Sequence, residues 1–463
     1  MTPLQQLQKV ASPDLQPSPR VNSAGINFKA PRFTNTFGRL DVDPTQSQQT
    51  IRIALAGCGV VGGGLVRLLH ESAAAIASRF GLRFVITSVL VRDTKRERHV
   101  PIPSHLFTDD LEFFLAQDAD VVIEAVGGEE PARTIAVSAL RRGRQLITAN
   151  KELIANHGDS LDELASLYNT GLDFGAAVGG SVPIISTLRD LVGASAPRSV
   201  RGILNGTSNF VISQLERGTT LESALDLACA HGLAEPDCSR DLDGSDAAAK
   251  LAIIAWIAFG IKPALLQLRR ISLLPGLAQL TRFALHRGGR LRFIAECRRL
   301  QGNAVVASVE PVIVPSSSAF ARTTFEENRV EVDLGWTSPL SVSGPGAGGE
   351  TTAAALLGDL VRAAAPPPPN GRGPAATQFT SIRENGDHRW LIGARLDAAV
   401  LAARADAAGL TVTEPTVDRD CAFVITEPAT WECSQRLLAD LGTLGATPFV
   451  ARYEIDEQEE ERQ

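Results

Sequence analysis

Residues 51–64 read IRIALAGCGVVGGG, and this stretch decides the fold. It joins an apolar, strand-forming run to a helix-forming segment through a Gly-x-Gly-x-x-Gly turn. In such a turn the first glycine permits a tight bend, the second lets the backbone approach a pyrophosphate, and the third packs helix on strand. Free N–H groups at the start of the helix favour the anion. The pattern therefore predicts a dinucleotide site at the backbone of Gly57, Gly59, Val60, Val61 and Gly62.

Strands and helices continue to alternate after this turn. Residues 60–80 have a helical pattern, and FVITSVLVRD, at 84–93, has that of a second strand. The segments DVVIEAVGG, RQLITAN and LDFGAAV are typical of later strands, with helical segments between them. Such alternation predicts an α/β fold of the Rossmann type, with a doubly wound parallel sheet. We assign this domain to residues 51–181 and expect residues 341–365 to complete it.

The pattern changes after the first domain. Helices followed by a strand-rich part predict a second, α+β domain over residues 182–340. A Pro-rich linker at 366–376 precedes a strand, helix, strand, strand, helix, strand pattern at 377–455, which fits a small two-layer α+β regulatory domain. The two ends are polar. We expect residues 1–50 to form a mobile extension and residues 456–463 an acidic, solvated tail.

Composition excludes several classes of function. The chain of 463 residues carries a net charge of −7 and lacks a basic stripe, which argues against a nucleic-acid partner. It has no run of about 18 apolar residues, so we expect no membrane span. Its 6 cysteines are scattered without a C-x-x-C pair. We therefore expect no disulfide framework, no cysteine metal site and a cytoplasmic location.

The end of the second predicted strand should contact the adenosine ribose of the cofactor. There the sequence runs Val91-Arg92-Asp93, followed by Lys95 and Arg96. An acid would favour NAD, whereas arginine and lysine would accommodate the 2′-phosphate of NADP. Both are present, so the choice stays open, with Arg92 and its basic neighbours favouring NADP. The alternative is that these residues only cover a solvated turn.

Residues 232–250, GLAEPDCSRDLDGSDAAAK, concentrate charge immediately before an apolar helical run. Asp246 and Lys250 stand four residues apart and therefore share one helix face. A lysine held by a carboxylate at the mouth of an apolar helix is a candidate proton donor or substrate clamp. The alternative is a solvated acidic loop with an ordinary surface ion pair.

Several motifs follow one another along the chain: the glycine turn, ITANKELIA, AAVGGSVPII, ILNGTSNFVI and the charged segment at 232–250. In this combination the chain resembles the homoserine dehydrogenases over about residues 51–364. The resemblance implies reversible, NAD(P)-dependent hydride transfer between aspartate 4-semialdehyde and L-homoserine, on the route to threonine and methionine. It also implies a homodimer or homotetramer, with the second domain as the dimer contact.

The same resemblance implies roles for single residues. Lys250 is the proton donor, Asp246 orients it, Lys151 lies between nicotinamide and substrate, and Glu235 holds the substrate's ammonium group. A zwitterionic substrate with one reactive carbonyl needs such an acid for its amine and a cation near the developing alkoxide. The remaining matched or well-placed residues are Asp241, Asn205 and Thr207 for the substrate and Gly127, Gly128 and Gly346 for the cofactor.

One departure from the family concerns a cation site. Members often bind a monovalent cation through a glutamate three residues before the valine of A-x-V-G-G, together with nearby backbone carbonyls. Those carbonyls match Val178, Gly180 and Val182, but Gly175 stands in the glutamate's place. Loss of the carboxylate should weaken the site.

A second departure lies in residues 377–455, which resemble an ACT-type regulatory domain. Such domains often bind threonine at a turn that contains an aspartate and a glycine and precedes an apolar helix. Here the turn begins at Asp397, and Ala399 takes the glycine's place. Because alanine is disfavoured where φ must be positive, the substitution argues against threonine inhibition.

Two other functions stay open on the sequence. The chain could be another NAD(P)-dependent amino-acid reductase, or a non-catalytic protein that senses a dinucleotide. The intact set of Lys151, Glu235, Asp246 and Lys250 argues against the sensing function. Aspartate-semialdehyde dehydrogenase is disfavoured, because it needs a nucleophilic cysteine paired with a histidine and no cysteine here has that context.

Overall fold

The computed structural model describes residues 48–192, 196–234, 237–364, 379–413 and 415–455. Residues 1–47 of the N-terminal extension lie outside these ranges, as do the whole Pro-rich linker, the whole acidic tail and Glu235.

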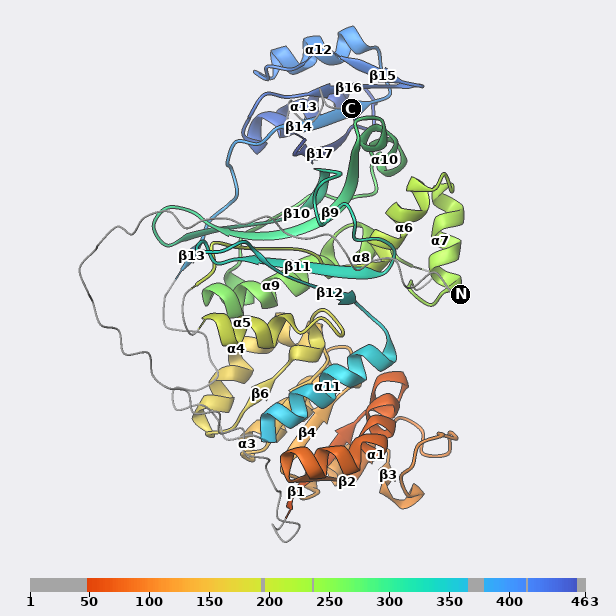
Figure 1. Cartoon of the computed structure of the whole chain (residues 1–463), viewed down its shortest axis with the longest axis vertical. Helices are drawn as coiled ribbons and strands as arrows, with labels where there is room; N and C mark the ends of the chain where they lie inside the picture. Colours follow the sequence, from red (N-terminus) through yellow and green to blue (C-terminus); the bar gives the residue numbers. More distant parts are fainter. Residues whose placement is uncertain (1–47, 193–195, 235–236, 365–378, 414, 456–463) are drawn as a thin grey trace, which may run out of the picture. The chain divides into compact units, whose positions relative to one another are not determined.

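The first domain is built on a parallel sheet, drawn from red to yellow in Figure 1. Its strand order is β3-β2-β1-β4-β5-β6, so the chain crosses over at β1 and winds outward in both directions. This confirms the predicted doubly wound sheet. The strands are β1 (Gln49–Ala56), β2 (Leu82–Leu90), β3 (Phe107–Thr108), β4 (Val121–Glu124), β5 (Gln145–Thr148) and β6 (Leu172–Asp173). The helices between them are α1 (Val60–Phe80), α2 (Leu111–Ala116), α3 (Ala132–Arg141) and α4 (Lys151–Leu167).

A helix from much later in the sequence packs against this domain. α11 (Gly349–Ala364) lies along α1, as Figure 1 shows. The contact is close because α1 carries glycines on this face: a Cβ added at Gly64 would lie 3.0 Å from the Cβ of Ala353. Leu356 and Leu360 of α11 are fully buried in the same core as β1.

Within the described residues α1 also has the length and hydropathy that a membrane-crossing helix would need. Its buried side chains, among them Leu65 and Val66, belong to the apolar core that α1 shares with β1, β2 and α11. Packing inside the Rossmann layer therefore accounts for the apolar composition of this helix.

One predicted strand is shorter than expected. β6 covers only the first two residues of LDFGAAV, and Gly175–Ala177 form a 3₁₀ turn. The chain leaves the sheet because the N–H of Ala176 donates to Asp359 Oδ2 of α11, at 3.0 Å, and not to a neighbouring strand. This part of the strand prediction was wrong.

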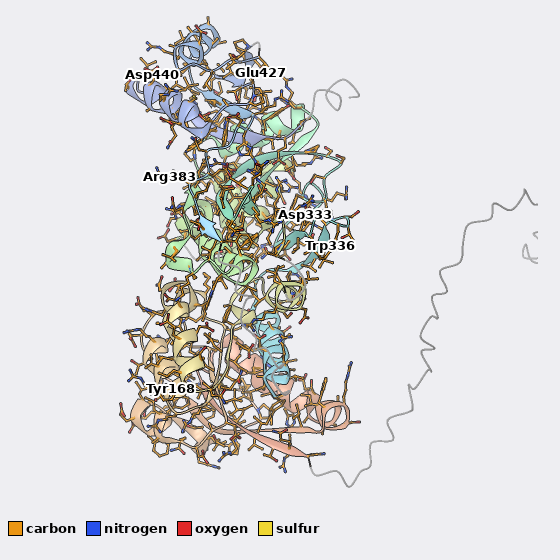
Figure 2. All side chains as sticks on the ribbon, turned by 90° about the vertical axis from the view of Figure 1, so that its left-hand side faces the viewer. Tyr168, Asp333, Trp336, Arg383, Glu427 and Asp440 are labelled. Carbon is orange, nitrogen blue, oxygen red and sulfur yellow. The ribbon has the colours of Figure 1, made fainter. Side chains whose placement is uncertain are left out.

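The second domain combines helices with a mixed sheet. The sheet strands are β7 (Ser199–Ile203), β8 (Leu268–Arg270), β9 (Gly289–Arg299), β10 (Ala304–Pro315), β11 (Glu327–Asp333) and β12 (Leu340–Pro345). Its helices are α5 (Ile184–Val192), α6 (Gly206–Glu216), α7 (Leu221–Ala230), α8 (Ser239–Leu242), α9 (Ser245–Phe259) and α10 (Leu277–His286). α9 is buried on almost every side between this sheet and the helices α4 and α5. Near the β11–β12 turn, Trp336 is 60% exposed (Figure 2).

The C-terminal part continues the same sheet. It contains β14 (Trp390–Ala394), α12 (Ala398–Ala407), β15 (Thr416–Asp418), β16 (Cys421–Ile425), α13 (Trp431–Thr443) and β17 (Phe449–Tyr453), in the predicted order of strands and helices. β17 pairs in parallel with β10, which gives the strand order β12-β11-β7-β9-β10-β17-β14-β16-β15. A short strand, β13 (Thr380–Ser381), also pairs with β10. The small domain is therefore joined to the second domain by backbone hydrogen bonds.

A buried cluster of charges lies where these parts of the sheet meet. The guanidinium of Arg452 on β17 contacts Glu296, Glu310 and Glu454 at 2.7, 3.0 and 3.0 Å. Arg269 of β8 adds a second ion pair to Glu310, at 2.9 Å. Burial alone would raise the pKa of Glu296, but the charges of Arg452 and Arg201 outweigh it and hold that pKa below its usual value.

We expect Arg452→Met to lower the free energy of unfolding by about 3–5 kcal/mol, because it takes the ion-pair partner from Glu296 and one of two partners from the buried Glu310. The measurement is the midpoint of urea unfolding. Arg404→Met is the matched control, since its partner Asp440 is 3.4 Å away and both side chains are about 40% exposed. The free energy of unfolding of Arg404→Met should fall by less than about 1 kcal/mol. Equal shifts in the two variants would contradict the importance of the buried cluster.

Candidate functional site

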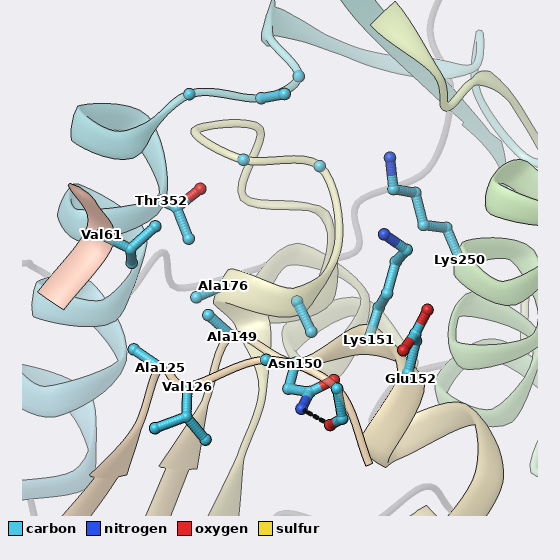
Figure 3. A pocket seen from close by; sticks show the side chains of 18 residues that line it. Val61, Ala125, Val126, Ala149, Asn150, Lys151, Glu152, Ala176, Lys250 and Thr352 are labelled. Carbon is cyan, nitrogen blue, oxygen red and sulfur yellow. Dashed lines mark hydrogen bonds between the residues drawn. The ribbon is translucent and has the colours of Figure 1, made fainter. Parts of the chain in front are cut away.

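A cavity of about 440 Å³ opens at the carboxyl ends of the parallel strands (Figure 3). This is where open α/β sheets bind their ligands. Its walls come from the segments after β4 and β5, the turn at 176–180, the start of α11 and one side chain of α9. The predicted residues that line it are Val61, Gly127, Gly128, Lys151, Gly180, Lys250 and Gly346.

The glycine turn beside this cavity needs its glycines. Gly57 has φ of +93°, and a Cβ there would lie 2.4 Å from the carbonyl oxygen of Ala125. A Cβ at Gly62 would lie 2.0 Å from the carbonyl oxygen of Gly57. Next to Gly59 the described residues leave open space, which gives room for a ligand at the start of α1. The turn thus has the close backbone packing and free helix N-terminus that suit a pyrophosphate.

A buried hydrogen-bond network fixes the opposite wall, and sequence reasoning missed it. Glu124 is fully buried; its carboxylate accepts the N–H groups of Val126 and Gly127 and the hydroxyl of Thr148. Asn150 donates to the carbonyl of Gly128 at 2.6 Å and caps α4 by accepting from Leu153 N. The amide of Asn150 before a helical run is the signal that could have identified this cap.

Two lysines from different domains meet on one carboxylate. Lys151, the first residue of α4, lies 2.9 Å from Asp246 Oδ1, and Lys250 of α9 lies 2.9 Å from Asp246 Oδ2. Lys250 also donates to the carbonyl of Leu204, at 2.8 Å. Figure 3 shows both amines pointing into the cavity from neighbouring helices. The predicted Asp246–Lys250 pair forms, and its side chains are only 10% and 12% exposed, so it is not an ordinary surface pair.

The electrostatics of this group fix the charge of Asp246. Burial would raise the pKa of its carboxyl, but the charges of Lys250 and Lys151 and the hydrogen bonds from Lys250 and Asn205 hold that pKa well below its usual value. Asp241 behaves in the opposite way. Burial, together with the negative charge of Asp246, raises its pKa despite a hydrogen bond from Asn205. The ionised form of Asp246 is therefore favoured, whereas Asp241 takes up a proton more readily than an ordinary aspartate.

Asn205 and Thr207 make hydrogen bonds to the segments around Asp246. The amide of Asn205 donates to Asp241 at 2.7 Å and to Asp246 at 2.8 Å, while its oxygen caps α6. Thr207 donates to the carbonyl of Leu233 at 2.6 Å. Asn205 contacts the carboxylate that holds the two lysines, and Asn205, Thr207, Asp241 and Asp246 do not line the main cavity themselves.

An ion pair that the sequence did not indicate spans the rim of the site. Arg240 of α8 contacts Glu152 of α4 at 2.6 Å. Glu152 lines the cavity, and Arg240 is the neighbour of Asp241 in the chain. The pair therefore links the segment that carries Asp241 to the first domain.

The other predicted positions lie further out. Arg92 is exposed just beyond β2 and does not line the cavity. Gly180 and Val182 border a second cavity, behind the turn at 176–180. Across the described ranges there is no group of three or more His, Cys, Asp or Glu side chains that could hold a metal ion.

This arrangement suits proton transfer beside a hydride carrier. A dinucleotide on the glycine turn would extend into a cavity lined by two ammonium groups, which a carboxylate just outside the cavity holds together. A lysine so placed can give a proton to an oxygen as that oxygen receives negative charge.

Comparisons with known proteins agree with this chemistry. The profile described as "Homoserine dehydrogenase, NAD binding domain" matches residues 57–172, and that described as "Homoserine dehydrogenase" matches residues 183–361. A homoserine dehydrogenase of Mycobacterium tuberculosis is 35% identical over 345 residues, which cover 72% of this chain and 77% of that protein. One of Corynebacterium glutamicum is 32% identical over 337 residues, covering 72% of this chain and 76% of that protein.

Solved structures agree as well. A homoserine dehydrogenase from Thiobacillus denitrificans superposes with a TM-score of 0.77 at 26% identity, covering 88% of this chain and 99% of that one. The Staphylococcus aureus enzyme gives a TM-score of 0.68 at 26% identity with the same coverage. The order of motifs, the fold and these relatives lead to one conclusion. The chain belongs to the homoserine dehydrogenase family.

Proposed function

We propose that in this NAD(P)-dependent oxidoreductase Lys250 exchanges a proton with the reacting oxygen of the substrate. Lys151 adds a second positive charge near that oxygen, and Asp246 positions both lysines. The observation that carries the proposal is that both amines rest on one buried carboxylate at the cavity. Bound nicotinamide supplies or accepts the hydride. The chain's own residues have to bind the amino acid, hold its oxygen near a cation and move the proton.

Lys250 suits this task because its surroundings hold it in one place. An ammonium group has three N–H donors, and the described residues provide two acceptors for it, Leu204 O and Asp246 Oδ2. One donor remains for the substrate oxygen. In the direction of reduction, Lys250 gives its proton to the aldehyde oxygen as the hydride reaches the aldehyde carbon. In the direction of oxidation, it takes the hydroxyl proton back.

Lys151 contributes a second positive charge near the same oxygen, and Asp246 keeps both amines from separating. Two cations beside the developing alkoxide stabilise it more than they stabilise the neutral carbonyl, which is the condition for lowering the barrier. For the substrate's ammonium group we propose Glu235 and Asp241. Support for Asp241 comes from its hydrogen bond with Asn205, which also contacts Asp246.

The backbone around the glycine turn, with Gly127, Gly128 and Gly346, is the proposed cofactor site, and we propose NADP as the preferred cofactor. Arg92 supports this preference, because it stands exposed at the end of β2. A hyperthermophilic archaeal homoserine dehydrogenase was solved in complex with NADPH; it is 22% identical to this chain.

We further propose a homodimer or homotetramer in the cytoplasm. The exposed Leu340, at the start of the edge strand β12, and the exposed Trp336 just before this strand support self-association. All 6 cysteines lie in the described ranges and none takes part in a disulfide, which fits a reducing compartment. For the C-terminal domain, an ACT-like architecture is supported by its split β-α-β order. Ala399 lies in the first turn of α12 with no positive φ, so the strain expected from the missing glycine does not arise.

The first prediction concerns Lys250. Purified enzyme should oxidise L-homoserine with NADP⁺ or NAD⁺, and Lys250→Ala should lower kcat by about 10²–10⁴-fold, because the proton loses its carrier. The measurement is steady-state absorbance of the reduced cofactor. Lys262→Ala is the matched control, since Lys262 makes an equally short ion pair with Glu163, at 2.8 Å, on the surface. A Lys250→Ala variant with normal kcat would refute the proton role, and no turnover by the unmodified enzyme would refute the activity.

The second prediction concerns the 2′-phosphate. Arg92→Ala should raise KM for NADP⁺ by about tenfold, the effect of losing about 1.4 kcal/mol of binding, and leave KM for NAD⁺ unchanged. Arg83→Ala, an exposed arginine at the other end of β2, should change neither value. If Arg92→Ala weakens NADP⁺ and NAD⁺ alike, Arg92 does not determine the preference.

The third prediction uses the opposite pKa shifts of the two aspartates. Asp241 has a raised pKa in the fold, so stability falls as the pH rises from the unfolded value of about 3.9 and this carboxyl ionises. Asp246 has a lowered pKa, so its contribution to stability is fully present above the unfolded value and is lost progressively as the pH falls from there toward the lower pKa of the folded state. At pH 7 Asp241→Asn should therefore keep or raise the thermal midpoint while raising KM for homoserine, and Asp246→Asn should lower the midpoint.

Thermal unfolding at pH 7 and at about pH 4 tests these signs. At about pH 4 Asp246→Asn should keep most of its deficit, because the contribution of Asp246 is lost only as the pH falls further toward the lower pKa of the folded state. A lower midpoint for Asp241→Asn at pH 7 would show that the ionised form of Asp241 stabilises the fold, which is the opposite of what a raised pKa requires.

A further inference from the structure

The turn that carries Gly175 has no room for a side chain at that position. A Cβ built on Gly175 would lie 2.5 Å from Asp359 Oδ1 and 3.0 Å from Oδ2. Asp359 belongs to α11 and is only 2% exposed. Its carboxylate therefore fills the space in which a glutamate at 175 would have to begin.

Both oxygens of this carboxylate already have donors. Oδ2 accepts the N–H of Ala176 at 3.0 Å, and Oδ1 accepts from the guanidinium of Arg362 at 2.9 Å. The neighbouring buried carboxylate, Asp173, is paired with Arg189 at 2.6 Å. Each negative charge here thus has a positive partner from the chain itself.

Asp359 and Arg362 share a cavity with the backbone expected to bind a cation. The cavity has a volume of about 240 Å³, and Gly175, Gly180 and Val182 also line it. An alkali ion needs several oxygen ligands, and without a net negative charge it gains little on leaving water. To reach Asp359 it would have to displace a guanidinium that is covalently attached to the protein. The residues present therefore do not fit the monovalent cation that the family implies.

We infer that the guanidinium of Arg362 replaces that cation, so this homoserine dehydrogenase works without added Na⁺ or K⁺. The hydrogen bond from the N–H of Ala176 to Asp359 ties α11 to the turn at 175–182, and Arg362 neutralises the carboxylate that accepts this bond. Ala176, Ala177, Gly179 and Gly180 of that turn also line the catalytic cavity, so the pair positions one of its walls. Arg362 is a positioning residue, and it does not touch the proposed substrate site.

The test compares chloride salts of choline, Na⁺ and K⁺ at constant ionic strength. The unmodified enzyme should have the same kcat/KM and the same thermal midpoint in all of them. Arg362→Ala should lose both activity and thermal stability in choline chloride and recover them in NaCl or KCl, because a free ion can then enter beside Asp359. Arg362→Gln, which keeps hydrogen-bond donors but no charge, should show the same dependence.

Arg395→Ala is the matched control, since Arg395 pairs with Asp420 at 2.9 Å on the surface, and it should remain insensitive to the cation. A several-fold activation of the unmodified enzyme by Na⁺ or K⁺ would overturn the inference. So would Arg362 variants that stay independent of the cation or that fail to fold in every salt. The thermal midpoint needs no turnover, so this result is separable from failure of the proposed proton path.

Discussion

The sharing of one buried carboxylate by two lysines is the interaction on which the site depends. Lys151 belongs to the first domain and Lys250 to the second, and Asp246 holds both at 2.9 Å. Removing these charges from water is costly, and the cost is offset only while all three groups stay together. The ion pairs therefore fix two domains in one relative geometry, and the same geometry puts two cations next to the cofactor cavity. The same three residues therefore fix the domain arrangement and supply the charges of the proposed catalytic site.

Much of the fold could be predicted because local and global signals agree. The glycine turn at 57–62 lies between an apolar strand and a helix, and only a parallel sheet uses those elements in that order. The helix at Val60–Phe80 has the bounds that the sequence indicated, and Asp246 and Lys250 lie on one helix as expected. In each case neighbouring residues alone carry the information, through periodicity and helix-starting residues.

The features that could not be predicted depend on contacts between residues far apart in the sequence. No local pattern connects Gly175 with Asp359, yet the carboxylate of Asp359 takes the hydrogen bond that would have extended β6. Likewise, the pairing of Lys151 with Asp246 joins residues 95 positions apart in the sequence, and the Glu124 network becomes visible only when β4 and β5 lie side by side. The pair at 246 and 250 could be predicted because it lies within one helix; its second lysine was suggested by family resemblance and not by spacing.

The C-terminal domain, too, could be predicted only in part from local sequence. Its strands and helices follow from sequence, but the attachment of β17 to β10 does not, because strand pairing between distant segments leaves no local trace. The charged cluster at Arg452 lies across this attachment. Any motion of the small domain against the second domain would have to break parallel hydrogen bonds and expose buried charge. The two parts are therefore suited to move together.

The position of α11 has a consequence for synthesis of the protein. The first domain begins at β1, but the apolar surface of α1 and β1 is covered by Ala353, Leu356 and Leu360, which the ribosome adds about 300 residues later. During translation this surface remains exposed to solvent until the whole second domain has been synthesised. The first domain is thus completed only after the second domain has been synthesised, and the nascent chain exposes apolar surface of an incomplete nucleotide-binding fold during that time.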